Sequence, residues 1–304
     1  MTAPPRIFDR DLHRRRLARA AGGYSGADFL KRRAAQDLVV RLSAVARSFS
    51  LAVDLGARNG AFVQALEEEG LDAKVELLIE TDISGALLAH ARPGVIADEE
   101  RLPFAESSLD LVVSSLALHW VNDLVGALIQ IRLALAPDGL FLGALLGGAT
   151  LTELRQCLLA AEEEIRGGAG PRVSPFLDAY DGAALLQRAG FALPVVDVDT
   201  VVVRYDHPLK LIADLRAMGE TNVLVDRPSA ALTRAVLARA SEIYIERFGE
   251  NGRIPATFEI INLTGWAPHP DQQKPLRPGS AKARLADALG AVERPAGEAA
   301  GGQA

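Results

Sequence analysis

Acidic side chains and glycines recur in the first part of the chain at places where a bound nucleoside would need them. The segment VDLGARNG, Val53–Gly60, starts as an apolar strand and continues into a glycine-containing turn. Glycine permits a tight turn and a close approach of the backbone to a ligand. The segment therefore predicts a strand, a turn and a helix that hold a cofactor through Asp54, Gly56 and Gly60.

Further acidic positions follow at the spacing of successive strand and helix pairs. The run VELLIETD ends in Asp82, where a carboxylate could bind the two hydroxyls of a cofactor ribose, and Ile83 comes next. Asp98 and Glu99 lie in IADEERLPF, where a carboxylate could accept a hydrogen bond from an adenine amino group. We predict that these four residues contact the cofactor.

A fourth segment, Leu109–Leu124, indicates a strand, a turn at Ser114 and Ser115, and a helical stretch. Both serines join the predicted cofactor-binding residues. His119 and Trp120 follow this strand where a substrate would approach the cofactor, so His119 is the candidate catalytic base or orienting group. The alternative is that both residues pack the start of a helix.

The elements that must position these residues alternate between strand and helix. Strands are predicted at Leu51–Leu55, Val75–Glu80, Val95–Ala97, Leu109–Ser114 and Leu140–Leu145. Helices are predicted at Ala27–Ala46, Ala61–Glu69 and Val125–Leu135, the last ended by Pro137, Asp138 and Gly139. This alternation is typical of an α/β fold with a parallel sheet covered on both faces. Right-handed crossovers bring the strand ends to one edge, so the cofactor site is a single crevice.

The second half of the chain departs from simple alternation. Two helices are predicted, Thr150–Ile165 and Asp181–Arg188 with Gly190 as its cap, and a β run follows at Val195–Tyr205. Two helical patterns, Leu209–Met218 and Ser229–Phe248, are inserted before the last predicted strand, Ala256–Trp266. We interpret this helical insertion as a lid over the crevice. The predicted division is an N-terminal helical segment at 1–50, a Rossmann-like core at 51–205, a lid at 206–253, the last core strand at 254–267 and a partly disordered C-terminal extension at 268–304.

Composition fits a single soluble enzyme and excludes several other classes. The 304 residues carry a formal net charge of −6, so no broad basic field attracts nucleic acid. The one cysteine, Cys157, rules out an intramolecular disulfide and a multi-cysteine metal site, and its apolar neighbours favour packing. No apolar run reaches about 18 residues and the first residues lack a signal-peptide apolar region, so neither secretion nor stable membrane insertion is expected. We expect a cytoplasmic protein, in the cytosol of a bacterium or in the mitochondrial matrix of a eukaryote.

The arginine-rich run Arg10–Arg19 admits two interpretations. Transit peptides are poor in acidic residues, whereas Asp9 and Asp11 interrupt this run. A solvated amphipathic helix is therefore the favoured interpretation.

Several longer segments resemble a known family. They are IFDRDL, DEERLPF, LVVSSLALHWVNDL, PDGLFLGALLGGATLTELR, LRAMGETN and IPATFEIINLTGW. From about Arg6 to Ser280 the chain resembles the family of the mitochondrial complex I assembly factor with a methyltransferase fold, and more distantly the malonyl-carrier-protein methyltransferase of biotin synthesis. The resemblance implies a class I methyltransferase fold, with a seven-stranded sheet of order 3-2-1-4-5-7-6, and bound S-adenosylmethionine (SAM). It also implies an unusual activity, the hydroxylation of an arginine in a complex I core subunit. That subunit is then the expected partner.

One residue departs from the turn of this family. Methyltransferases generally carry glycine in the middle of the turn, whereas this chain has Arg58 between Gly56 and Gly60. The Arg58 side chain must point away from the cofactor or reach toward the carboxylate of its methionyl part.

The acceptor of the reaction stays open. Hydroxylation would ordinarily suggest an iron site of two histidines and a carboxylate, yet only His269 has such a spacing, to Asp271, so no metal is predicted. Asp206, Asp214 and Glu220 could instead pair with a substrate guanidinium, or be solvated helix charges. The alternatives are a SAM-dependent methyltransferase acting on a protein of complex I assembly, an arginine hydroxylase of the same fold, a malonyl-carrier-protein or small-molecule O-methyltransferase, and a SAM-binding assembly factor without turnover.

Overall fold

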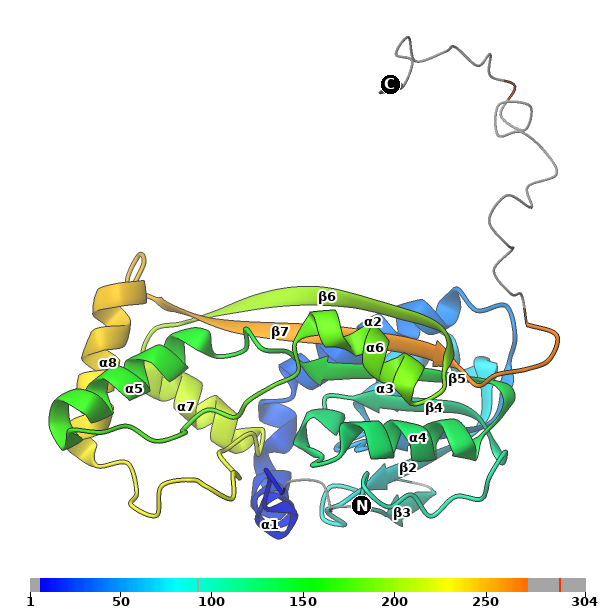
Figure 1. The fold of residues 1–304 in the computed structure, drawn as a ribbon, viewed down its shortest axis with the longest axis horizontal. Helices are drawn as coiled ribbons and strands as arrows, with labels where there is room; N and C mark the ends of the chain where they lie inside the picture. The colour runs from blue at the N-terminus through cyan, green and yellow to red at the C-terminus, as the bar shows by residue number, and fades with distance from the viewer. Residues whose placement is uncertain (1–5, 92, 273–289, 291–304) are drawn as a thin grey trace, which may run out of the picture. The chain divides into compact units, whose positions relative to one another are not determined.

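A seven-stranded sheet forms the centre of the computed structural model, which describes residues 6–91, 93–272 and 290 (Figure 1). The strand order is β3-β2-β1-β4-β5-β7-β6, as predicted. The strands are β1 (Phe49–Leu55), β2 (Val75–Asp82), β3 (Gly94–Ile96), β4 (Leu109–Ser115), β5 (Leu135–Leu146), β6 (Ala192–Tyr205) and β7 (Ile254–Trp266). Strands β1 to β5 pair in parallel, and β7 runs antiparallel to both β5 and β6. This is the predicted class I methyltransferase fold.

Helices cover both faces of the sheet because successive strand residues point to opposite sides. In β4, Leu111 and Val113 pack in one core with helices α2 and α3, whereas Val112 packs in a second core with α4 and α6. The helices are α1 (Arg10–Ala20), α2 (Phe29–Ser43), α3 (Ala61–Glu68), α4 (Leu124–Ala134), α5 (Thr152–Arg166), α6 (Ala179–Arg188), α7 (Pro208–Ala217) and α8 (Arg234–Phe248), with short 3-10 turns η1 (Ala21–Gly26), η2 (Asp72–Lys74) and η3 (Leu118–Trp120). The two cores hold the carboxyl ends of β1, β2 and β4 at one edge.

Several predicted boundaries were wrong, including those of two helices and one strand. The helix predicted from Ser229 begins at Arg234, because the side chain of Thr233 caps it by accepting a hydrogen bond from the Val236 amide. The helix predicted at Ala27–Ala46 is shorter and spans α2, Phe29–Ser43. Strand β5 begins at Leu135 rather than Leu140, since Leu135 already pairs with Leu109 before the strand register shifts.

The N-terminal helix is only partly solvated, which corrects the interpretation of the arginine run. Arg10, His13, Leu17 and Ala20 of α1 recur at helical spacing and are buried, because this face of the helix lies against the sheet edge. The segment before α1 pairs with the segment after α7, where the Asp9 amide donates to the Val223 carbonyl over 2.8 Å. The helix is thereby fixed over the carboxyl ends of the strands.

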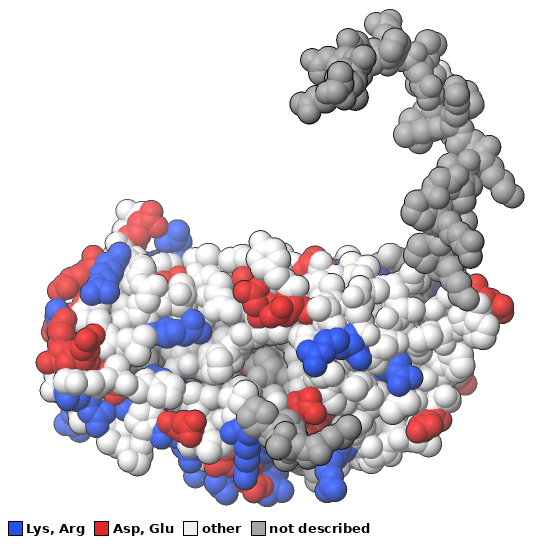
Figure 2. Space-filling model, in the orientation of Figure 1, with Lys and Arg blue, Asp and Glu red and all other residues white. Residues whose placement is uncertain are grey.

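Charged side chains of both signs are intermixed over the face shown in Figure 2, and basic side chains gather around α1. In the part of the chain that the structure describes, no helix is long and apolar enough to cross a membrane. Most of the predicted C-terminal extension, 268–304, lies outside the described residues, and the division of the chain into a core and a lid stays a prediction.

Candidate functional site

The turn after β1 has a left-handed backbone at Gly56, Arg58 and Gly60, with φ angles of 69°, 58° and 74°. A side chain is excluded at Gly56, because an added Cβ would collide with Ala117 and lie 3.2 Å from Glu99 Oε1. Gly60 caps the N-terminus of α3. For Arg58 this backbone costs about 1 kcal/mol or more, since left-handed conformations are disfavoured for residues with a Cβ.

Asp82 ends β2 and is fully buried beside this turn. Its Oδ1 accepts a hydrogen bond from the Ser84 amide over 2.8 Å. Its Oδ2 accepts two from Arg58, one from Nη1 over 2.6 Å and one from the backbone amide over 3.2 Å. Asp82, the carboxylate predicted to bind the cofactor ribose, therefore pairs with a guanidinium of the chain itself. Ile83 packs against α1 and η1 through Leu17 and Tyr24.

The acidic pair after β3 is also joined to an arginine. Arg10 of α1 donates to Asp98 Oδ1 over 2.7 Å and to Glu99 Oε2, and its other terminal nitrogen donates to the Trp120 carbonyl. Glu99 is buried, with its Oε1 pointing over Gly56. Helix α1 thus closes the crevice at the place predicted for the adenine.

A lysine and an aspartate lie buried at the centre of the crevice. Lys31 of α2 donates from Nζ to the Gly56 carbonyl over 2.5 Å and to the Ser115 carbonyl. Burial raises the pKa of Asp54 to about 7, and burial lowers the pKa of Lys31 to about 8, while the attraction between the two groups opposes both shifts. Ser114 is occupied internally, because its hydroxyl donates to the Leu55 carbonyl over 2.9 Å.

Several buried polar atoms around this crevice have no hydrogen-bond partner within the described part of the chain. They are both carboxylate oxygens of Asp54, Nη2 of Arg58, the hydroxyls of Ser84 and Ser115, and Oε1 of Glu99. Buried polar atoms are normally paired, so unpaired ones grouped at the ends of β1, β2 and β4 indicate a place for a polar ligand. The acceptors and donors suit the hydroxyls, amino groups and carboxylate of SAM, apart from the pairing of Asp82 with Arg58.

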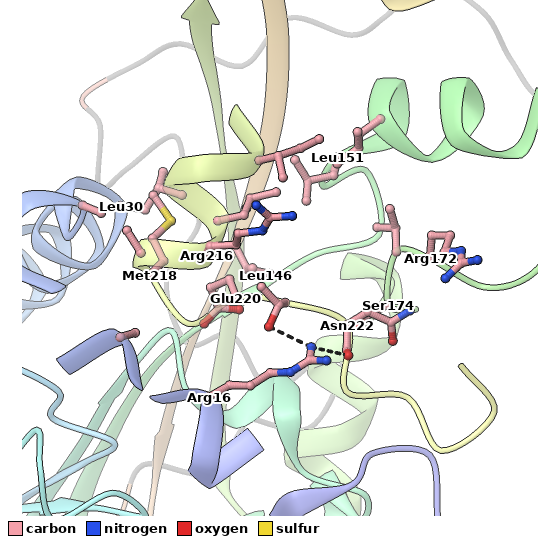
Figure 3. A pocket seen from close by; sticks show the side chains of 18 of the residues that line it. Arg16, Leu30, Leu146, Leu151, Arg172, Ser174, Arg216, Met218, Glu220 and Asn222 are labelled. Atoms are coloured by element: carbon pink, nitrogen blue, oxygen red, sulfur yellow. Dashed lines mark hydrogen bonds between the residues drawn. The ribbon is translucent and has the colours of Figure 1, made fainter. Parts of the chain in front are cut away.

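A cavity of about 810 Å³ adjoins the crevice (Figure 3). Lys31, Leu116 and His119 line it, and so do Leu215 and Met218 of the α7 region. Its size is in the range of small-molecule and side-chain sites. Among the described residues that line it, Glu220 is the only acidic side chain. The predicted lid thus contributes one wall of a substrate-sized space.

Glu220 links the cavity to the candidate base. Its Oε2 lies 3.2 Å from His119 Nε2 and accepts a hydrogen bond from Trp120 Nε1 over 2.9 Å. The His119 side chain is buried, and its Nδ1 has no partner among the described residues. His119 therefore packs against Trp120, as the alternative interpretation has it.

The other two predicted guanidinium partners lie elsewhere. Asp206 is exposed and pairs with Lys210 over 2.7 Å and with Arg253 over 3.3 Å. Asp214 lies near Tyr205, where burial and then the Asp214 carboxylate raise the pKa of the tyrosine hydroxyl, and neither aspartate lines the cavity. Of the three carboxylates, the structure brings only Glu220 into contact with the cavity.

Two further histidines, His90 and His207, have structural partners. His90 pairs with Glu80 over 3.1 Å, and His207 accepts from the Leu209 amide at the start of α7. Cys157 is buried, and burial raises the pKa of its thiol to about 11, so it is not a thiolate near neutral pH. Within residues 6–91, 93–272 and 290, no three His, Cys, Asp or Glu side chains lie close enough together to hold a metal ion.

Sequence reasoning missed four residues of the site, Arg10, His13, Tyr24 and Lys31. All are buried, and burial together with Arg58 and Arg10 holds the pKa of His13 well below its ordinary value. A signal was present for two of them, since Arg10, His13 and Leu17 share one face of the predicted helix.

Comparisons with known proteins agree with the fold. The methyltransferase domain model matches residues 53–143. A putative methyltransferase from Bacillus halodurans superposes with a TM-score of 0.53 at 16% identity, over 77% of this chain and 99% of that one. This likeness shows the fold alone, and SAM is the cofactor that such a domain indicates.

Relatives by sequence cover nearly the whole chain. The mitochondrial arginine-hydroxylase NDUFAF5 of Danio rerio is 42% identical over 92% of this chain and 89% of its own length, and the Homo sapiens protein is 42% identical over 90% and 81%. The malonyl-[acyl-carrier protein] O-methyltransferase of Methylovorus is 34% identical over 88% and 92%. The chain therefore belongs, by fold and sequence, to the SAM-dependent methyltransferase-like enzymes, in the family of the arginine-hydroxylase NDUFAF5.

Proposed function

We propose that this enzyme binds SAM in the crevice and modifies an arginine side chain of a protein in complex I assembly, with the guanidinium held by Glu220. The observation that carries the proposal is Glu220, the single carboxylate that the described residues contribute to the cavity wall, 3.2 Å from His119. A carboxylate binds a guanidinium through two parallel hydrogen bonds. The names of the relatives and the resemblance to the complex I assembly factor supply the substrate class and the partner.

The crevice residues divide the binding of SAM among them. Asp82 would accept from the ribose hydroxyls, Asp98 or Glu99 from the adenine amino group, and Gly56 leaves room for the backbone to approach the cofactor. When bound, SAM supplies an electrophilic methyl group to an acceptor in the cavity. Lys31 contacts the crevice and lines the cavity, so it stands where the two meet.

His119 has the geometry of a positioning group or base. With its proton on Nε2 it donates to Glu220, which leaves Nδ1 as an acceptor. A proton released by the acceptor could move to Nδ1, and Glu220 would stabilise the resulting imidazolium. The same carboxylate thus orients both the substrate and the histidine.

A second candidate function is O-methylation of an acidic thioester on a carrier protein. Four arginines line the cavity, Arg16, Arg19, Arg172 and Arg216, and its interior is rich in leucine. Guanidinium groups around an apolar cavity suit an anionic head on an acyl chain. The carrier-protein methyltransferase relatives favour the same reaction.

Mass spectrometry separates these functions. The purified protein is incubated with SAM and either an arginine-containing segment of a complex I core subunit or a malonyl carrier protein. Dioxygen and a reductant are added, because hydroxylation takes its oxygen atom from dioxygen and needs two electrons to reduce the second oxygen atom to water. A gain of one oxygen on arginine supports hydroxylation, a gain of one methylene on arginine supports methylation, and a gain of one methylene on the carrier supports the second candidate. No change in either acceptor would contradict an enzymatic role and favour an assembly factor that binds SAM without turnover.

We propose that the protein lies in the cytosol of a bacterium or, in a eukaryote, in the mitochondrial matrix.

A further inference from the structure

The guanidinium of Arg58 fills part of the crevice that the cofactor requires. Arg58 is 1% exposed, and its Nη1 lies 2.6 Å from Asp82 Oδ2. The same nitrogen is 3.6 Å from the point that a Cβ on Gly56 would occupy. The Arg58 side chain therefore lies between the turn at Gly56 and Asp82, the carboxylate predicted to bind the ribose.

The Arg58 side chain is incompletely satisfied there. Its backbone adopts the left-handed conformation that favours glycine, and its Nη2 has no partner among the described residues. The pair with Asp82 persists because a buried carboxylate without a counter-charge is more costly than a paired one. A ligand whose hydroxyl groups donate hydrogen bonds to Asp82 would satisfy the carboxylate without the Arg58 ion pair.

We propose that Arg58 is a displaceable occupant of the ribose end of the SAM site and sets the affinity of this chain for SAM. The ribose hydroxyls and the Arg58 guanidinium compete for Asp82 Oδ2, so SAM binds only when the ion pair opens. Glu99 Oε1 is unpaired and lies 3.2 Å from the same point over Gly56, which offers the released guanidinium a new acceptor. This inference rests on the proposed use of the crevice for SAM.

The test is calorimetric titration of SAM into the full-length protein and two variants, Arg58→Gly and Arg58→Gln. Each variant removes the competitor, and we expect each to bind SAM at least tenfold more tightly than the unchanged protein. Arg41→Ala is the matched control, because it breaks another arginine ion pair, to Asp197 over 2.6 Å, outside the crevice. Its affinity for SAM should equal that of the unchanged protein. Circular dichroism confirms the fold of each protein before titration.

A double-variant cycle ties the effect to Asp82. In the Asp82→Asn background the carboxylate is gone, so Arg58→Gln should no longer tighten binding. Unchanged affinity in both Arg58 variants would overturn the proposal. Weaker binding would also overturn it and would mean that Arg58 holds the carboxylate of SAM. Absence of SAM binding in every variant would contradict the cofactor assignment itself, which distinguishes that failure from failure of this inference alone.

Discussion

Replacement of Glu220 by Gln tests the substrate side of the site. Glutamine keeps the size of the side chain and an oxygen that can accept from Trp120 Nε1, but it removes the negative charge. Because Glu220 is the only acidic side chain among the described residues lining the cavity, no neighbouring carboxylate there replaces it. We therefore expect the variant to fold and to bind SAM while losing activity on arginine.

The size of the loss follows from the burial of the carboxylate. The Glu220 side chain is 16% exposed, so solvent screens its interactions weakly. A hydrogen bond to a charged group in such a place is worth about 1.5 to 3 kcal/mol. Since each 1.4 kcal/mol is about a factor of ten, kcat/KM should fall roughly ten- to hundredfold.

The assay is mass-spectrometric turnover of an arginine-containing acceptor at several substrate concentrations. Asp206→Asn is the control, because it removes an exposed carboxylate that lies outside the cavity, and it should leave kcat/KM unchanged. Equal kcat/KM for Glu220→Gln and the unchanged protein would refute the assignment of Glu220 to the substrate guanidinium.

Three further predictions concern the groups around the crevice. Burial raises the pKa of Asp54 from 3.8 to about 7, so between these pH values the folded state binds more protons than the unfolded state. The free energy of unfolding should therefore fall as pH rises from about 4 to 7. Asp54→Asn should remove this decline in urea titrations, and a retained decline would exclude Asp54 as its source. Arg10→Ala leaves Asp98 and Glu99 without their guanidinium and should lower the free energy of unfolding by about 3 kcal/mol, whereas a loss below about 1 kcal/mol would show that the ion pairs contribute little. Cys157 is buried with its pKa raised to about 11, so it should react with a thiol reagent only after urea unfolding, and rapid labelling of the native protein would contradict its packing role.

Much of the fold could be predicted from the sequence, because the same short segments indicate both a strand and the position of its carboxyl end. A buried apolar run followed by an aspartate, as at Asp54 and Asp82, marks a strand and its carboxyl end, and the right-handed crossover rule then places these ends at one edge. The structure brings both aspartates to that edge with Glu99. Their roles in binding SAM remain predictions.

The ion pairs of the crevice could not be predicted in the same way. The pairing of Arg10 with Glu99, and of Arg58 with Asp82, depends on how α1 and the β1 turn lie in space, and no local periodicity encodes either contact. The sequence showed that Arg58 was unusual without showing which carboxylate it contacts. The position of Lys31 was hidden for a similar reason, since a lysine on a helix is most often solvated and this one is 3% exposed.

Mapping of arginine modification in complex I tests the central claim most directly. Complex I is isolated from the source organism with and without the gene for this chain, and the arginines of its core subunits are compared by mass spectrometry. We predict one core-subunit arginine that is modified only when the gene is present, with restoration by the unchanged gene and not by the Glu220→Gln variant. An identical modification pattern and normal assembly in both strains would contradict the claim.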